Sequence, residues 1–168
     1  MTAILILGVD PGLNRCGWGL VSSEGSRLTH VAHGVIKPPT HQQLASRLHD
    51  VFEGLCGVIE KYRPNEAAVE ETFVNSNARA ALALGQARGV ALAAAARRGL
   101  AVAEYAPATI KKAIVGSGAA DKTQISFMVR RLLPTAGEVS ADAADALGVA
   151  LCHAAHGGFR RRAEKIGR

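Results

Sequence analysis

The chain has few of the residues that brace small secreted proteins or that mark a membrane segment. Only three of its 168 residues are cysteine, and this odd number at wide spacings predicts neither a disulfide framework nor a zinc site. Aromatic residues make up 4%, so most of the apolar content is aliphatic. The apolar run at residues 3–9 has no basic start and is too short to cross a membrane. We therefore expect a cytosolic protein with reduced thiols and no membrane partner.

The residues that are present favour one folded domain with a polyanionic partner. Apolar residues make up 48% of the chain, which argues against a wholly disordered protein. A length of 168 residues fits a single domain that can bury a hydrophobic core. The formal charge of +6 favours nucleic acid or an acidic membrane surface as a partner. We expect one domain over residues 1–157 and a basic, disordered tail over 158–168.

Apolar periodicity and turn residues predict an α/β fold. The expected strands cover residues 3–9, 17–23, 28–37, 66–70 and 100–105. The expected helices cover residues 42–62, 78–98, 107–115, 121–133 and 141–155. The first three strands are separated by turn residues and should form an antiparallel meander. A β-α-β-α pattern then follows, which predicts one mixed sheet with helices on its faces.

Four acidic residues occupy positions at which a folded protein seldom places a charge without a partner. Asp10 ends the first apolar strand, and Glu70 ends the strand at 66–70. Asp142 and Asp145 are three residues apart at an expected helix start, so their carboxylates share one helix face. Ordinary alternatives exist, namely a turn cap for Asp10, a solvated strand end for Glu70 and a first-turn helix acid for Asp142.

Together the four acids predict a metal centre. If the first and fourth strands run side by side, Asp10 and Glu70 meet at one edge of the sheet, across which the helix at 141–155 can pack. Carboxylates gathered so closely repel one another unless cations are present. Hard oxygen ligands suit Mg²⁺ or Mn²⁺. Two such ions about 3.5–4 Å apart can activate water and stabilise the leaving oxygen of a phosphodiester.

Five motifs stand in order along the chain. They are Gly8-Val-Asp-Pro-Gly12, Val69-Glu-Glu-Thr-Phe73, Leu84-Gly-Gln-Ala-Arg-Gly89, Val115-Gly-Ser-Gly118 followed by Asp121-Lys122, and Ala141-Asp-Ala-Ala-Asp-Ala-Leu147. Together they closely resemble the bacterial RuvC family of Holliday-junction resolvases. The resemblance runs from about residue 4 to about residue 155.

This resemblance implies a ribonuclease-H-like fold, with a mixed five-stranded sheet flanked by helices, and a homodimer that nicks four-way junction DNA in pairs. It implies that Asp10, Glu70, Asp142 and Asp145 are catalytic and bind two Mg²⁺ ions per subunit, with Mn²⁺ as a substitute. Some family members carry His at the position of Asp142, but this chain keeps the acid. The resemblance also implies a branch-migration complex of the RuvA and RuvB type as a partner.

Three further residues are expected to contact DNA. The resemblance places Lys111 and Lys122 near the phosphates, and a lysine is a suitable point charge for that role. It also implies that Phe73, in a polar loop, stacks on an unpaired base. The alternatives are two solvated lysines and a core phenylalanine. Gly85 and Gly89 lie four apart in one helix and would allow close approach, either of a second subunit or of the chain's own sheet.

Two other functions remain open at this point. A nucleotide-binding actin-like or heat-shock-chaperone-like domain would share the core, and Asp10-Pro-Gly12 loosely fits its first phosphate loop. However, nucleotide binding there needs two such domains, and 168 residues supply one. A non-catalytic junction-binding module would explain the basic charge and a dimer. It would not explain four acids, each of which weakens phosphate binding.

Overall fold

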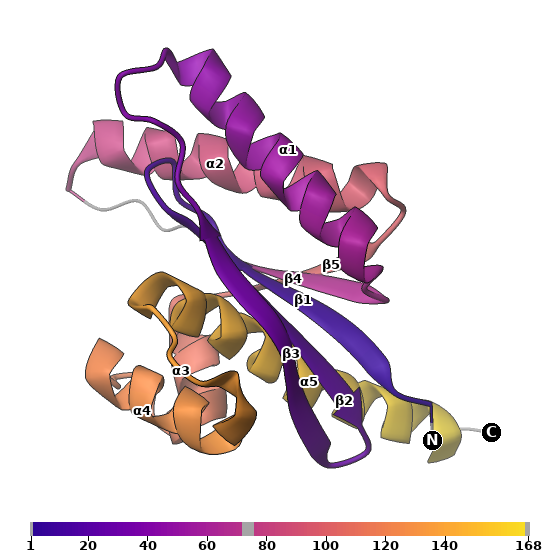
Figure 1. Cartoon of the computed structure of the whole chain (residues 1–168). Coiled ribbons are helices and arrows are strands. Elements are labelled where there is room, and N and C mark those ends of the chain that lie inside the picture. The colour runs from indigo at the N-terminus through magenta and orange to yellow at the C-terminus, as the bar shows by residue number, and fades with distance from the viewer. Residues whose placement is uncertain (1, 72–75, 167–168) are drawn as a thin grey trace.

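The computed structural model describes the backbone of residues 2–71 and 76–166, with side chains as far as residue 157. Its strands form one five-stranded sheet in the order β3-β2-β1-β4-β5 (Figure 1). The strands are β1 (Ile4–Asp10), β2 (Cys16–Glu24), β3 (Arg27–Ile36), β4 (Glu66–Glu70) and β5 (Ala101–Tyr105). β1, β2 and β3 pair antiparallel, whereas β4 pairs parallel with both β1 and β5. The predicted meander and the mixed α/β sheet are therefore confirmed.

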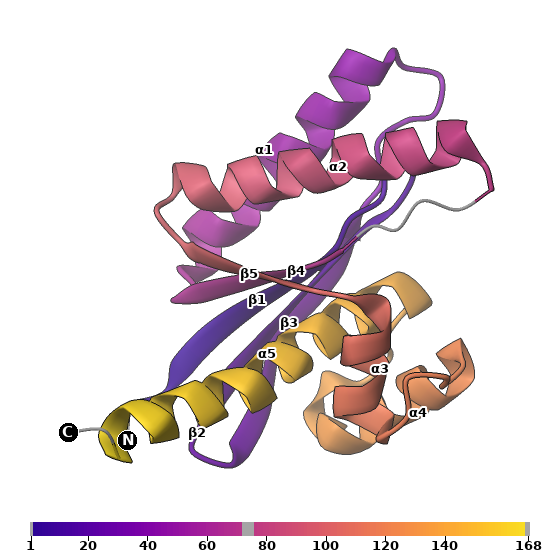
Figure 2. The same ribbon diagram turned by 180° about the vertical axis from the view of Figure 1, so that it is seen from behind.

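Helices cover both faces of this sheet. They are α1 (Leu44–Tyr62), α2 (Ala78–Arg97), α3 (Pro107–Val115), α4 (Lys122–Leu132) and α5 (Ala141–Ile166), with a 3-10 turn at Pro134–Ala136. α1 and α2 lie on one face, and α5 crosses the other face with α3 and α4 beside it (Figures 1 and 2). The sheet therefore separates two hydrophobic layers. No helix in the described part of the chain is long and apolar enough to span a bilayer.

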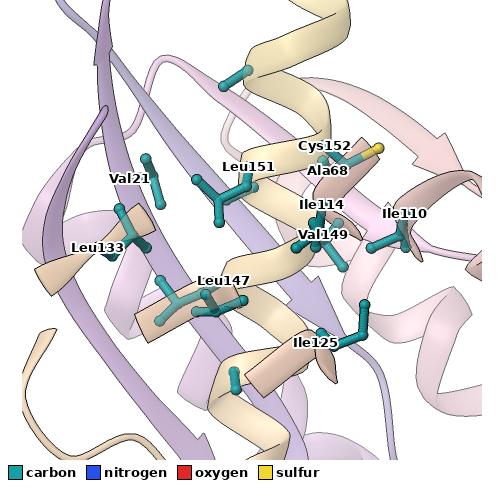
Figure 3. Packing of buried hydrophobic residues seen from close by; sticks show 14 of the residues in the cluster. Val21, Ala68, Ile110, Ile114, Ile125, Leu133, Leu147, Val149, Leu151 and Cys152 are labelled. Atoms are coloured by element: carbon teal, nitrogen blue, oxygen red, sulfur yellow. The ribbon is translucent and has the colours of Figure 1, made fainter. Parts of the chain in front are cut away.

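Alternate side chains of the central strands supply these two layers. On β1, Ile6 packs towards α5, whereas Leu7 and Val9 pack towards α1 and α2. On β4, Ala68 faces the α5 layer and Val69 faces the other. Figure 3 shows the α5 layer, in which aliphatic side chains of α3, α4 and α5 meet the sheet. The two central strands are thus buried on both faces, and only their ends can present polar groups.

The helices begin within a few residues of their expected positions, but one of them extends much further. α5 was expected to end at residue 155, and it continues to Ile166. The backbone of the segment expected to be a disordered tail is therefore helical as far as Ile166. The division into a domain over 1–157 and a tail over 158–168 stays a prediction.

Candidate active site

Asp10 and Glu70 occupy the matching ends of two neighbouring parallel strands. β1 pairs with β4 in a register that joins Val9 to Val69, so the next residue on each strand is an acid. The two carboxyl groups are hydrogen bonded to each other. Side-by-side placement of these strands was predicted from the sequence, and the pairing confirms it.

The helix α5 reaches this edge because glycines on the sheet leave room for its backbone. A Cβ atom added at Gly8 would lie 2.1 Å from the carbonyl oxygen of Ala146, and one added at Gly17 would lie 2.1 Å from that of Asp142. A Cβ atom at Gly19 would lie 2.6 Å from the side chain of Leu147. No side chain fits such gaps, so the first turns of α5 rest directly on β1 and β2. We call Gly8, Gly17 and Gly19 the glycine bed.

Lys122, the first residue of α4, faces the acid that α5 brings to the edge. Its Nζ lies 3.5 Å from an Oδ of Asp145. The charge of Asp145, and then those of Asp10 and Asp142, raise the pKa of Lys122. Lys111 on α3 also acts electrostatically on Glu70 and Asp145. Both predicted lysines therefore stand in the field of the acids.

The nearby lysines do not fully compensate the carboxyl groups of Asp10, Glu70 and Asp145. Burial, followed by the charge of Glu70, raises the pKa of Asp10 to about 8. Burial also raises the pKa values of Glu70 and Asp145, although the two lysines oppose the shifts. Desolvated carboxylates of this kind need a close cation or a proton. The donor set is composed of hard oxygen atoms and so fits a divalent ion such as Mg²⁺.

Asp142 is held differently from the other three acids. The Nε of Arg15 donates a 2.6 Å hydrogen bond to an Oδ of Asp142, which forms an ion pair. Asp142 nevertheless contributes to the field at Asp145 and Lys122. As the described side chains stand, no three Asp, Glu, His or Cys groups converge closely enough to ligate one ion. Asp10, Glu70 and Asp145 thus share one electrostatic environment without the close approach that a bound ion requires, and Asp142 is paired with Arg15.

Sequence reasoning missed Arg15 and the glycine bed. Arg15 and Asp142 are 127 positions apart, and an arginine after a turn carries no local signal for such a partner. The alanines of α5 add little bulk at this contact, and Ala143 and Ala146 are fully buried there. The motif Gly8-Val-Asp10 offered a signal, because glycine weakens a strand and marks close backbone approach.

Two further predictions have different outcomes. Phe73 lies outside the described residues. Gly85 and Gly89 are exposed on α2, and a Cβ atom added at either would meet nothing within 4 Å. Their packing against the chain's own sheet, one of the two alternatives, is therefore wrong.

Comparison with protein families identifies a match over most of the chain. The family model described as crossover junction endodeoxyribonuclease RuvC matches residues 6–153. A protein of that name from Caulobacter sp. (strain K31) is 63% identical over 151 residues, which cover 90% of this chain and 89% of the relative. Another, from Hyphomonas neptunium, is 56% identical over 155 residues, which cover 92% and 93%.

Solved structures agree with this match. The Thermus thermophilus RuvC in complex with a Holliday junction substrate superposes with a TM-score of 0.86 at 30% identity, covering 93% of this chain and 96% of that one. The yeast mitochondrial Holliday junction resolvase Ydc2 gives a TM-score of 0.63 at 12% identity, covering 96% and 85%, and so shares the fold. The acids at the strand ends, the matched sequence and the matched fold together show that this chain belongs to the RuvC family of crossover junction endodeoxyribonucleases.

Proposed function

We propose that this endonuclease resolves Holliday junctions by paired, metal-dependent hydrolysis of phosphodiester bonds. The observation that carries the proposal is the meeting of Asp10 and Glu70 at adjacent strand ends, opposite Asp145. A purely DNA-binding module would gain nothing from buried acids at this edge, because they repel phosphate. The relative with the 0.86 TM-score was solved with a Holliday junction substrate, which supports the same substrate here.

The metal site in this proposal consists of Asp10, Glu70, Asp142 and Asp145. Two Mg²⁺ ions, or Mn²⁺ in their place, would supply an activated water and charge stabilisation at the leaving oxygen. The glycine bed keeps Asp142 and Asp145 at the sheet edge, and Arg15 holds Asp142. The shared hydrogen bond keeps Asp10 and Glu70 together before a cation arrives.

Lys111, Lys122 and Phe73 are the proposed DNA contacts. The two lysines bring positive charge to the acidic centre, where a phosphate would otherwise be repelled. The two lysines belong to α3 and α4, the helices that lie beside α5 (Figure 2). Phe73 follows Glu70 by three residues, a spacing that suits an aromatic ring stacking on a base near the cut.

The proposed assembly is a homodimer formed through α2. Leu82 is 65% exposed, and Gly85, Gly89 and Ala93 continue the same exposed face at spacings of three and four residues. Small residues let two helices approach closely. A two-fold dimer would present two active sites in a symmetric relation, as paired cuts require. We further propose that the dimer works in the cytoplasm with a branch-migration complex of the RuvA and RuvB type. The basic residues 158–168 would add salt-sensitive affinity for DNA.

A synthetic immobile junction and a linear duplex of matched sequence test this function. With Mg²⁺, we expect paired nicks at symmetric positions in the junction and little cutting of the duplex. EDTA should abolish the nicks but leave a complex visible by gel shift. Equal cutting of the duplex, or cutting in EDTA, would contradict the proposal.

A further inference from the structure

The outer face of α4 carries exposed side chains that play no part in the hydrophobic core. Phe127 is 62% exposed. Arg130 and Arg131 follow it by three and four residues, are also exposed, and therefore share its face of the helix. The buried residues of α4 are Ile125 and Val129, which pack into the α5 layer on the other side.

This combination differs from a lone apolar residue at a surface. Single exposed hydrophobic residues are common and identify nothing by themselves. Here an aromatic ring stands beside two guanidinium groups, and the sequence of α4 from Lys122 to Leu132 contains no acid. Guanidinium groups bind phosphates, and an aromatic ring packs against bases. The face is thus complementary to a nucleic-acid backbone in both charge and chemistry.

The position of α4 links this face to the acidic centre. The helix starts at Lys122, which contacts Asp145, and runs away from it. Nine residues further, Arg131 lies about 14 Å along the axis, close to the rise of roughly four nucleotides in one DNA strand. Arg130 also borders a hollow with Glu138 and Ser140, just before α5 begins. The face formed by Phe127, Arg130 and Arg131 therefore belongs to the helix that starts at the acidic centre, and it begins five residues beyond Lys122.

We propose that Phe127, Arg130 and Arg131 bind the backbone of the DNA strand that leads away from the scissile phosphate. The two arginines contact neighbouring phosphates, and the ring packs against an adjacent sugar or base. The proposal rests on the proposed function, because it requires DNA at the acidic centre. In this arrangement, α4 holds one junction arm while Lys122 contacts the phosphate at the cleavage position.

Salt-dependent binding of the immobile junction in EDTA provides the test. Each phosphate contact contributes about 0.9 to the slope of log affinity against log salt. The proposed homodimer brings two copies of each arginine to one junction, so the double variant Arg130→Gln with Arg131→Gln removes four phosphate contacts. It should therefore lower that slope by about 3.6 and weaken binding by roughly a thousandfold or more at 0.1 M salt. Phe127→Ser should weaken binding with the slope unchanged. All three positions are exposed, so melting temperatures should match the wild type.

A matched control removes the same charge from the opposite edge of the sheet. Arg27 lies at the β2–β3 turn and Lys61 near the end of α1, both far from Asp10 along their elements. The double variant Arg27→Gln with Lys61→Gln should keep the wild-type slope. An α4 double variant with wild-type affinity and slope would overturn the inference.

Three outcomes separate the possible failures. If the wild type cuts the junction in Mg²⁺ and the α4 variants bind it unchanged, only the α4 inference fails. If the wild type neither binds nor cuts the junction, the proposed function fails and the inference with it. If Phe127→Ser alters only the sedimentation coefficient, the face contacts a second copy of the chain, and the DNA assignment is wrong.

Discussion

Asp10 is held in a buried position beside a second carboxyl group, and this arrangement costs stability when no cation is present. Because its pKa in the folded protein, about 8, lies above the ordinary value, folding favours the protonated form. Stability should therefore fall as pH rises from about 4 towards 8, where the folded protein must ionise a desolvated group. A carboxyl cluster of this kind indicates a site built for a ligand rather than for stability.

Replacing Asp10 with asparagine removes that cost. In EDTA, we expect Asp10→Asn to raise the melting temperature, and the gain should grow between pH 5 and pH 8. Saturating Mg²⁺ should stabilise the wild type more than the variant, because a bound ion favours the folded state. Thermal denaturation followed by circular dichroism measures both effects. A variant that melts below the wild type at pH 8 would show that Asp10 is a structural residue.

Lys122 offers the converse test, because its side chain is 83% exposed and its ion pair contributes little to stability. We expect Lys122→Gln to lower the single-turnover rate of junction cutting by at least about tenfold with a change in unfolding free energy below about 1 kcal/mol. Lys112, an exposed lysine on α3 next to Lys111, is a control, and Lys112→Gln should retain most of the cutting rate. Equal rates for the two variants would remove Lys122 from the site.

At the scale of elements, the position of α5 relative to the sheet determines where two of the four acids stand. The glycine bed sets that position, because Gly17 allows the backbone of Asp142 to approach within a distance that no Cβ atom permits. Gly17→Ala should lift the start of α5, so we expect a higher Mg²⁺ concentration at half-maximal cutting.

Gly34→Ala is the matched control for that variant. Its added methyl group would meet the ring of Trp18 at 2.7 Å, on the side of the sheet away from α5. Both substitutions should lower the melting temperature, but only Gly17→Ala should change the metal requirement. An unchanged Mg²⁺ midpoint in a folded Gly17→Ala protein would mean that the glycine bed does not position the acids.

Elements were predicted well from the sequence because apolar periodicity is a local property. The five strands and their meander followed from residue patterns within short segments, whereas the side-by-side placement of β1 and β4 followed from the usual architecture of open α/β sheets. The approach of α5 did not, because it depends on glycines of β1 and β2 more than 120 positions away. Arg15 was missed for the same reason, since its partner Asp142 is distant in sequence. The contacts that shape the site are long-range, whereas the motifs that suggested it are local.

At the scale of the whole molecule, the exposed face of α2 predicts how two copies meet. Gly85→Leu would place a bulky side chain on that face, where the fold itself leaves space. We expect this variant to sediment as a monomer at micromolar concentration and to make single rather than paired nicks. Gly57 on α1 is also exposed with nothing within 4 Å of an added Cβ, so Gly57→Leu should remain dimeric. A dimeric Gly85→Leu protein would place the interface elsewhere.

In the proposed function, Asp10, Glu70, Asp142 and Asp145 form the catalytic metal centre of a junction-cutting enzyme. The most direct measurement compares junction binding in EDTA with single-turnover cutting in Mg²⁺ for the variants Asp10→Asn, Glu70→Gln, Asp142→Asn and Asp145→Asn. These changes keep side-chain size and remove a charge that repels phosphate. We predict that all four variants bind the junction at least as tightly as the wild type and that none cuts it. Near-normal cutting by any variant would contradict the assignment of that residue, and near-normal cutting by all four would refute the site.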